Sequence, residues 1–304
     1  MSEGNATLRL DHVTKAFDDF VAVDNLSLEV FPGKIFGLIG PNGAGKTTTI
    51  RMIVNITVPD SGRVELFGQL MNPRLQNRIG YLPEERGLYK KMKVSEQLRF
   101  LGELKGMSAG AADKAIDRWL DRLKLARWKN SKTDELSKGM QQKIQFIATV
   151  MHDPDLLILD ELFSGIDPVN AELMKEVVLG LKASGRTIIF STHMMEQAER
   201  LCDDICLINR SRKILEGSLR EVKKGFGRHA VALRAEGIDG LLDDPVLISS
   251  VKPYGDHVEV VLAEGADAQQ LLERLVAHGA RISRFEQIES SLHDIFIAKV
   301  DEQG

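Results

Sequence analysis

The stretch Gly40-Pro41-Asn42-Gly43-Ala44-Gly45-Lys46-Thr47-Thr48 reads G-x-x-x-x-G-K-T and directly follows an apolar run, residues 35–39. Its glycines allow backbone N–H groups to turn inward against a polyphosphate, a geometry that larger side chains would block. We expect a helix to follow the loop and to direct the positive end of its dipole at the same phosphates. The pattern therefore predicts a nucleotide-binding loop between a buried strand and a helix.

The residues of this loop have separate predicted roles. Lys46 is expected to reach the β- and γ-phosphates of the nucleotide, and Thr47 is expected to place its hydroxyl group on Mg²⁺. The other residues of the loop that we predict to bind the nucleotide are Gly40, Asn42, Gly43, Ala44, Gly45 and Thr48. The alternative is a glycine-rich turn before an ordinary helix, which requires the four fixed positions to coincide by chance.

The composition fits a large α/β domain followed by a smaller one. The chain has 304 residues, and domains commonly contain about 100 to 200. Forty basic and 44 acidic residues give a net charge of −4, which offers no overall attraction to nucleic acid or to anionic lipid. Cys202 and Cys206 are too few for a disulfide framework and lack the paired spacing of a zinc site, so we expect buried, reduced thiols.

We do not expect this chain to cross a membrane. Residues 1–5 are polar and lack the apolar centre of a signal peptide. The apolar runs stay well below the roughly 18 residues that a membrane-spanning helix needs. If the protein acts at a membrane, another chain must supply the pore.

The predicted elements begin with an antiparallel pair of strands and continue into a helical insertion. Alternating or continuous apolar residues predict strands at 7–13, 26–30, 35–39 and 63–67, with a helix at 46–56. Residues 79–82 resemble one more strand. Apolar residues at three- and four-residue spacing then predict a helical subdomain over about residues 84–150.

Buried strands resume after the insertion. Residues 156–159 form an apolar run that suits a strand buried on both faces, and Asp160-Glu161 follows at its carboxyl end. A helix over 170–184 separates it from a second buried strand, 187–191, which ends at Thr192-His193. This alternation, with polar side chains at the carboxyl ends of strands, predicts a doubly wound parallel sheet.

A change in composition marks the predicted domain boundary. Residues 225–304 contain 7 basic and 14 acidic side chains, a net charge of −7. The strands expected there are 229–233, 258–262 and 282–285, and the helices are 267–278 and 292–300. We expect a nucleotide-binding domain over residues 6–222 and a small acidic α+β domain over residues 223–304.

The order of these motifs resembles that of an ABC-type ATPase. The resemblance rests on the phosphate loop, on Leu136-Ser137-Lys138-Gly139, on residues 156–161 and on His193, and it covers about residues 7–218. It implies an α/β P-loop fold of ABC type, with a parallel-sheet core, an N-terminal antiparallel β subdomain and the helical insertion. The tail resembles the C-terminal extension of a subgroup that powers export systems of the sodium, drug or lantibiotic type.

The resemblance assigns the hydrolytic chemistry to three side chains. Asp160 would hold Mg²⁺ directly or through water, and Glu161 would polarise the attacking water as general base. His193 would contact the γ-phosphate of ATP and link it to Glu161. The alternatives are a solvated acidic pair at a strand end and a histidine with a structural role.

Other positions would complete the site across a dimer. Ser137 and Gly139 match the signature loop of the family, which would face the γ-phosphate bound by a partner in a head-to-tail dimer with two ATP molecules. Asp167 would contact the partner. The alternative for Ser137 is a simple helix cap. The chain departs from the family pattern at Lys138 (usually glycine) and at Met140 (usually glutamine).

Further assignments concern the loop at Glu84, the residue after the proposed base, and the adenine. Glu84 stands where the family usually has glutamine, and we expect it to touch Mg²⁺ and to report the nucleotide state to the membrane partner. A plain loop glutamate is the alternative. Leu162 stands where the family usually has proline. Phe17 is predicted to stack on adenine, although an ordinary core phenylalanine is nearly as good an interpretation.

We therefore expect the ATP-hydrolysing subunit of an ABC transporter, an exporter by its tail, bound peripherally to the cytoplasmic face of the membrane. The expected partners are a second copy or a related ATPase, and an integral-membrane permease; nucleic acid is not expected. Two alternatives remain open. One is a soluble ABC ATPase that acts on nucleic acid or ribosomes, and the other is a nucleotide switch with little hydrolysis.

Overall fold

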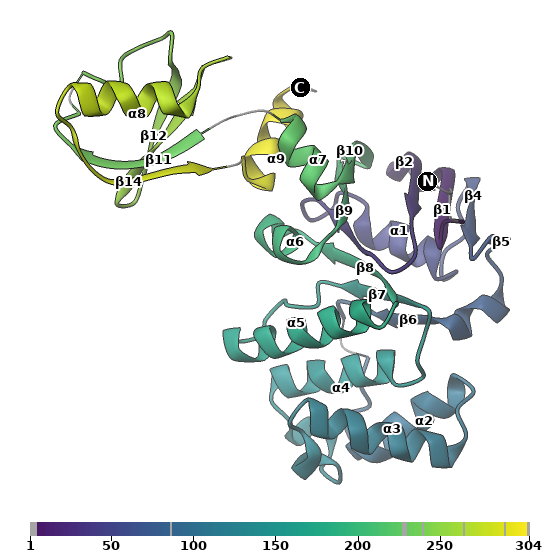
Figure 1. Ribbon diagram of the computed structural model, residues 1–304. Helices are drawn as coiled ribbons and strands as arrows, with labels where there is room; N and C mark the ends of the chain where they lie inside the picture. Colours follow the sequence, from purple (N-terminus) through teal and green to yellow (C-terminus); the bar gives the residue numbers. More distant parts are fainter. Residues whose placement is uncertain are drawn as a thin grey trace. The chain divides into compact units, whose positions relative to one another are not determined.

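The computed structural model describes residues 5–85, 87–226, 230–238, 240–263, 265–288 and 290–302. The chain divides into two compact units, Met1–Leu219 and Arg220–Gly304 (Figure 1). Both units mix helices and strands, as expected from the sequence. Among the described residues, no helix is long and apolar enough to span a lipid bilayer.

An antiparallel sheet of strand order β2-β1-β4-β5 begins the first unit. Its strands are β1 (Leu8–Phe17), β2 (Phe20–Val30), β4 (Ser61–Leu66) and β5 (Gln69–Leu70). β1 and β2 pair from Leu8↔Val30 to Phe17↔Phe20, so the hairpin is longer than the strands predicted at 7–13 and 26–30. Register shifts along the pair, with positive φ at His12 and Asn25, break the alternation of apolar residues on which that prediction relied.

The central sheet has the strand order β10-β9-β3-β8-β7-β6, and all neighbours except β10 and β9 run parallel. Its strands are β3 (Ile35–Ile39), β6 (Ile79–Leu82), β7 (Leu156–Asp160), β8 (Thr187–Thr192), β9 (Asp204–Asn209) and β10 (Arg212–Ser218). Every residue of β3, β7 and β8 is buried. Because these strands are parallel, their carboxyl ends bring the phosphate loop, Asp160-Glu161 and His193 to one edge.

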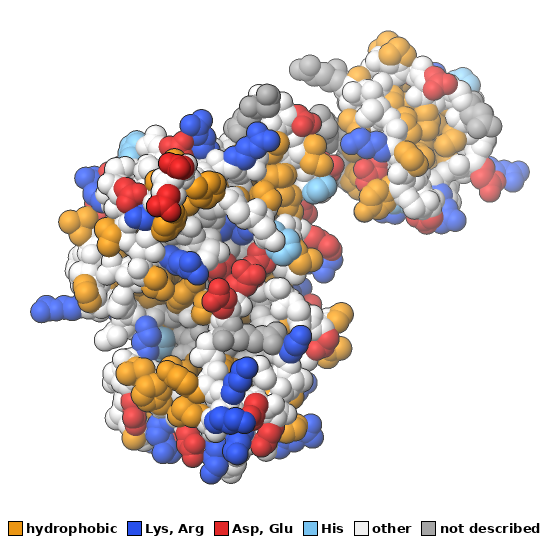
Figure 2. Space-filling model, turned by 180° about the vertical axis from the view of Figure 1, so that it is seen from behind, with side chains coloured by type: hydrophobic (Ala, Val, Ile, Leu, Met, Phe, Trp, Pro, Cys, Tyr) orange, Lys and Arg blue, Asp and Glu red, His pale blue; other side chains and the backbone are white. Residues whose placement is uncertain are grey.

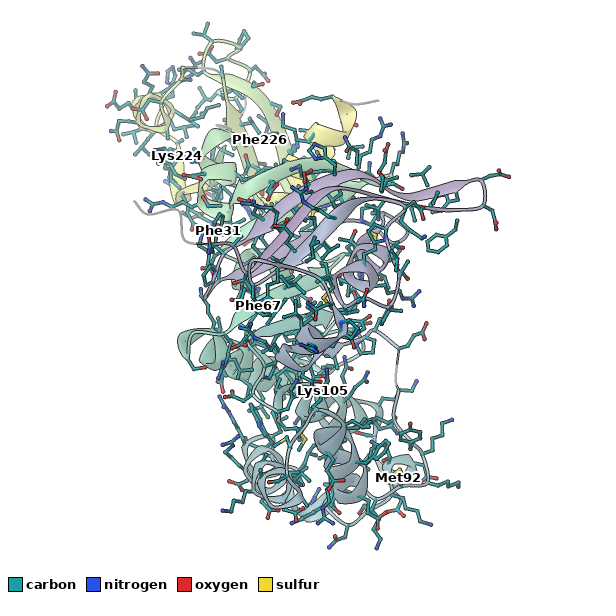
Figure 3. All side chains as sticks on the ribbon, turned by 90° about the vertical axis from the view of Figure 1, so that its right-hand side faces the viewer. Phe31, Phe67, Met92, Lys105, Lys224 and Phe226 are labelled. Atoms are coloured by element: carbon teal, nitrogen blue, oxygen red, sulfur yellow. The ribbon has the colours of Figure 1, made fainter. Side chains whose placement is uncertain are left out.

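Helices of the first unit cover the central sheet and form the predicted insertion. They are α1 (Lys46–Ile53), α2 (Val94–Leu104), α3 (Ala109–Arg122), α4 (Lys138–Val150), α5 (Pro168–Ala183) and α6 (Met195–Leu201), with 3-10 turns at Pro73–Arg78, Ala126–Trp128 and Thr133–Glu135. The insertion comprises α2, α3 and α4, as expected. Lys105, at its edge (Figure 3), donates to the carbonyl oxygens of Gln76 (2.8 Å) and Ile79 (3.1 Å), which ties α2 to the start of β6.

The second unit has an antiparallel sheet of strand order β12-β13-β11-β14. Its elements are α7 (Leu219–Gly225, which starts at the boundary), β11 (Ala230–Glu236), β12 (Ile248–Tyr254), β13 (His257–Leu262), α8 (Ala268–Ala277), β14 (Arg281–Ile288) and α9 (Leu292–Asp301). Leu271 and Leu275 of α8 pack on Val231, Leu233 and Val260 of the sheet.

Two elements of this region were not predicted from the sequence, namely β12 and α7. β12 contains Pro253 and lies at the edge of its sheet, where proline is tolerated although it argues against a strand in a sequence. Of the predicted strand 229–233, residue 229 lies outside the described residues, and residues 230–233 lie in β11.

The two cysteines are free and buried, as predicted. Burial raises the pKa of the Cys202 and Cys206 thiols far above the usual range. Both therefore remain protonated and unreactive at neutral pH.

Candidate active site

The phosphate loop connects β3 to α1 and depends on its glycines. Gly45 has φ +108°, and a Cβ atom there would lie 2.4 Å from the carbonyl oxygen of Ala22. A Cβ atom at Gly40 would lie 2.1 Å from the carbonyl oxygen of Ile208. Gly45 precedes α1 without a side chain to cap it, so the N–H groups of the first turn remain available to an anion.

Lys46 lies folded over this loop. Its side chain is 6% exposed, and its Nζ donates to the carbonyl oxygens of Gly40 (2.8 Å) and Pro41 (3.1 Å). Burial lowers the pKa of Lys46, and the nearby carboxylates of Glu161, Asp160 and Glu84 oppose this shift. The ammonium group is thus held at the mouth of the loop with carboxylates around it, where a phosphate could replace the carbonyl contacts.

Thr47 and Asp160 meet beside the loop and suit a divalent cation. The Thr47 hydroxyl donates to Asp160 Oδ2 at 3.3 Å. Asp160 is 2% exposed, and its Oδ1 has no hydrogen-bond partner in the described part of the chain. Burial raises the pKa of Asp160, and the hydroxyl groups of Ser191 and Thr47 offset only part of that rise, so the charge of Asp160 is only partly compensated. A hard cation such as Mg²⁺, which prefers hydroxyl and carboxylate oxygens, would supply that compensation.

Glu161 and His193 contact each other next to Lys46. Glu161 Oε1 accepts hydrogen bonds from the backbone N–H of His193 (3.0 Å) and from its Nδ1 (2.9 Å), and it lies 3.9 Å from Lys46 Nζ. Glu161 is 7% exposed and has φ +50°, a strained backbone for a non-glycine residue. Such strain persists only where surrounding contacts impose it, and it is frequent at functional sites.

A pocket of 420 Å³ collects most of the predicted residues. It is lined by Phe20, Ala22, Asn42, Gly43, Gly45, Lys46, Thr47, Thr48, Glu84, Asp160 and Glu161. Gly40 and Ala44 lie in the same loop but not on the pocket wall. His193 reaches the pocket through Glu161, and its side chain is 44% exposed.

Phe20, which lies opposite Phe17 in the hairpin, lines the pocket. Phe17 and Phe20 pair across the end of the β1–β2 hairpin, and both are about half exposed. Of the two, Phe20 lines the pocket, whereas Phe17 lies beside Lys15, whose Nζ is 5.5 Å from the centre of its ring. The signal for Phe20 is its position directly opposite Phe17, which becomes visible only when the full length of the hairpin is known.

Ser137, Gly139 and Asp167 lie together, and they are not on the pocket wall. Ser137 caps α4 by accepting from the backbone N–H of Met140 at 3.4 Å. Asp167 caps α5 through the N–H of Asn170 at 3.1 Å. A Cβ atom at Gly139 would lie 3.8 Å from Asp167 Oδ2. One chain therefore presents the phosphate loop and the Ser137 loop as separate surfaces.

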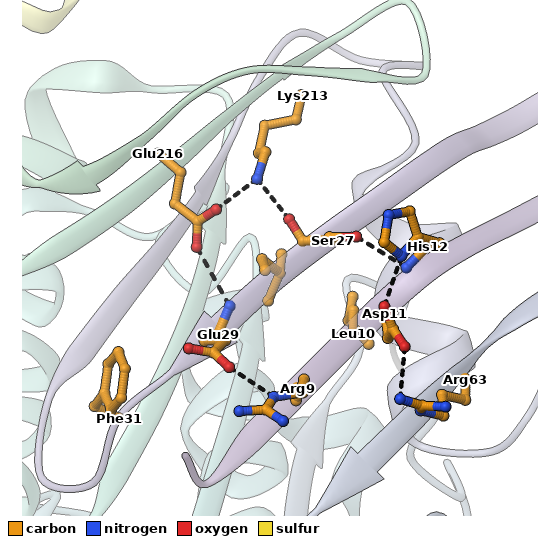
Figure 4. A pocket seen from close by; sticks show the side chains of 11 residues that line it. Arg9, Leu10, Asp11, His12, Ser27, Glu29, Phe31, Arg63, Lys213 and Glu216 are labelled. Carbon is orange, nitrogen blue, oxygen red and sulfur yellow. Dashed lines mark hydrogen bonds and ion pairs between the residues drawn. The ribbon is translucent and has the colours of Figure 1, made fainter. Parts of the chain in front are cut away.

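A second pocket of 510 Å³, which the sequence did not suggest, lies on the antiparallel sheet beside β10 (Figure 4). Its charges are already paired: Arg9 with Glu29 (2.6 Å), Arg63 with Asp11 (2.8 Å) and Lys213 with Glu216 (2.7 Å). Lys213 also donates to the carbonyl oxygen of Ser27 at 2.6 Å, which fastens β10 to β2. These contacts are suited to joining the two sheets.

Comparisons with known proteins agree with this site. Two family models match the chain: "ABC transporter" over residues 23–164, and "ATP-binding protein DrrA1-3-like, C-terminal domain" over residues 217–300. An uncharacterized ABC transporter ATP-binding protein of Bacillus subtilis, YhaQ, is 47% identical over 293 residues, covering 96% of this chain and 98% of that protein. The Nod factor export ATP-binding protein I of Burkholderia pseudomallei is 41% identical over 259 residues, covering 84% of this chain and 83% of that protein.

A solved structure of the ATP binding subunit of an ABC transporter aligns with a TM-score of 0.68 and 29% identity, over 73% of this chain and 93% of that one. Proteins of this family bind ATP, have ATPase activity in general and work with membrane permease subunits. The fold of the first unit, its phosphate loop and the family match of the tail all indicate the same family. The chain belongs to the family of ABC transporter ATP-binding proteins, in the group with a DrrA1-3-like C-terminal domain.

Proposed function

We propose that this subunit hydrolyses Mg-ATP and drives export through a separate membrane-spanning permease. The direction is supported by the relatives named for Nod factor export, of which one is 41% identical. In this proposal the protein binds peripherally to the cytoplasmic face of the membrane, where ATP is available.

Glu161 acts as the general base in the proposed reaction. The observation that carries this assignment is its buried carboxylate, which His193 holds through two hydrogen bonds beside the Lys46 ammonium group. Glu161 takes a proton from the attacking water, and Lys46 stabilises the charge on the β- and γ-phosphates. His193 orients the carboxylate of Glu161. In this proposal His193 also contacts the γ-phosphate.

Thr47 and Asp160 would hold Mg²⁺, with Glu84 as a further carboxylate on the pocket wall. When bound, the cation neutralises phosphate charge and so favours attack on the γ-phosphate. The unpaired Oδ1 of Asp160 supports this assignment. Asn42, Gly43, Gly45 and Thr48 bind the phosphates in this proposal, and an aromatic ring from the β1–β2 hairpin packs on the adenine.

A second ATPase subunit completes each site. Ser137 and Gly139 lie at the N-terminal end of α4, where the helix dipole favours an anion. Since they are separate from the pocket of their own chain, we assign them to the γ-phosphate held by a partner in a head-to-tail dimer, with Asp167 at the contact. The partner is a second copy or a related ATPase.

We retain the division into a nucleotide-binding domain, residues 6–222, and an acidic domain, residues 223–304, as part of this proposal.

Action on nucleic acid has less support. In Figure 2, acidic and basic side chains are interspersed over the visible face of the first unit. Such a mixed surface does not provide the continuous basic stripe that a phosphate backbone requires.

The Glu161→Gln substitution tests the proposal. We expect the hydrolysis rate to fall by at least about 100-fold, because the amide cannot accept the proton. ATP should still bind, and it should increase the dimer fraction in size-exclusion chromatography. Glu176→Gln, at an exposed glutamate of α5, provides a matched control for the same chemical change. A Glu161→Gln protein with full activity would contradict the assignment of the base.

A further inference from the structure

Helix α4 carries glutamine side chains that hold backbone carbonyl groups of the catalytic loops. The Nε2 group of Gln145 donates to the carbonyl oxygens of Pro83 (3.3 Å) and Glu85 (3.0 Å). It therefore bridges the two neighbours of Glu84. Gln145 is 7% exposed, so these hydrogen bonds are largely shielded from competing water.

Two more residues of α4 make similar contacts on the same face. Gln142 Nε2 donates to the carbonyl oxygen of Leu162 at 2.6 Å, immediately after Glu161. The Thr149 hydroxyl donates to the carbonyl oxygen of Gln145 at 3.0 Å and also lies 3.4 Å from the carbonyl oxygen of Tyr81 in β6. Positions 142, 145 and 149 follow the three- and four-residue spacing of one helix face. One side of α4 thus contacts both acidic segments of the site.

Glu84 itself lacks a side-chain anchor. It is exposed and lines the nucleotide pocket, and its charge acts on both Lys46 and Asp160. Within the described ranges, no hydrogen bond or ion pair holds the Glu84 carboxylate. Its direction therefore depends on the backbone of its own loop, which is the part that Gln145 holds.

We propose that Gln145 is a positioning residue: by holding the carbonyl groups on both sides of Glu84, it directs the Glu84 carboxylate toward the Lys46–Asp160 site. This inference rests on the proposed function, because it requires a Mg-ATP site that includes Glu84. Ser137 caps the N-terminal end of α4, which starts at Lys138. In this proposal, α4 also carries a displacement of that end to the Glu84 loop.

A double-mutant cycle between Gln145 and Glu84 tests this inference. Gln145→Leu removes both donors at similar volume, and Glu84→Gln removes the carboxylate. The four proteins are compared by their rate at saturating Mg-ATP and by the Mg²⁺ concentration that gives half of the thermal shift at fixed ATP. We expect Gln145→Leu to raise that concentration about 10-fold when Glu84 is present, and by less than about 2-fold in Glu84→Gln, because linked residues are not additive.

Gln141→Leu is the matched control. Gln141 is also a glutamine of α4 with two carbonyl contacts, to Thr133 (3.2 Å) and Leu136 (3.0 Å), but these lie at the Ser137 end and not at Glu84. Any effect of Gln141→Leu should be the same in both Glu84 backgrounds. Gln145→Glu, which keeps the length of the side chain and loses its donors, provides a second variant if Gln145→Leu does not fold.

The outcomes separate this inference from the proposed function. An equal change in both Glu84 backgrounds, or no change, would overturn the role of Gln145 while wild-type hydrolysis remained intact. A wild-type chain that fails to hydrolyse Mg-ATP would overturn both. Coupling at Gln145 together with additivity at Gln141 would support the inference.

Discussion

Replacing Gly45 by alanine tests the close approach of the phosphate loop to strand β2. The new methyl group would lie 2.4 Å from the carbonyl oxygen of Ala22 and 3.5 Å from Val23 Cγ2. Ala22 is 4% exposed, and its strand is fixed by pairing with β1. We expect the left-handed backbone to lower the free energy of unfolding by about 1–2 kcal/mol. Displacement of the Ala22 contact should lower it further, by about 1–3 kcal/mol, so the total loss of stability is roughly 3 kcal/mol.

Two other glycines separate these contributions. Gly43 and Gly185 have φ +80° and +89°, and a Cβ atom at either position meets nothing within 4 Å. Alanine at these sites should cost only the backbone strain, about 1 kcal/mol. Gly43 lines the nucleotide pocket, so its new methyl group should weaken ATP binding at least about 10-fold. Gly185 follows α5, outside the pocket, and its substitution should leave ATP binding unchanged.

Urea unfolding without nucleotide and a titration with ATP measure these effects. The free energy of unfolding should fall most for Gly45→Ala, by about 2 kcal/mol more than for Gly185→Ala. Gly43→Ala and Gly185→Ala should unfold alike and differ in ATP affinity. If Gly45→Ala is as stable as Gly185→Ala, the reasoning from the Ala22 contact is refuted.

Two further predictions concern the aromatic hairpin and the pH dependence. Phe20→Ala should weaken ATP binding by about 5- to 10-fold, and Phe17→Ala should weaken it less, as measured by calorimetry. A larger loss of affinity for Phe17→Ala would assign the adenine contact to Phe17. Burial lowers the pKa of His152 to about 4, whereas the unfolded chain binds this proton near pH 6.5. Stability should therefore fall as the pH decreases from 6.5 toward 4, by about 2–3 kcal/mol from this group. His152→Gln should remove that part of the pH dependence in urea unfolding; an unchanged profile would exclude His152 as its source.

The parallel core was predictable because its signals are local. Four apolar residues before Asp160, and a similar run before the phosphate loop, identify strands buried on both faces without knowledge of their neighbours. Parallel strands then place their carboxyl ends at one edge. The proximity of Lys46, Thr47, Asp160 and Glu161 follows from that rule.

Features that depend on contacts distant in the sequence were not predictable. The β1–β2 hairpin contains bulges that hide its period, so Phe20 was missed. The contacts of Gln145 with the Glu84 loop join residues about sixty positions apart, and a glutamine in a helix gives no sign of its partner. The edge strand β12 is largely exposed, and its hydrophobic pattern is accordingly weak.

The central claim is that the phosphate loop of one chain and the Ser137 loop of another form one hydrolysis site. Mixing two inactive variants, Lys46→Ala and Ser137→Arg, tests it most directly, because each mixed dimer contains one site with both elements intact. If two copies form the dimer, an equal mixture should recover up to about a quarter of the wild-type rate of ATP hydrolysis. A mixture no more active than the separate variants would contradict the claim.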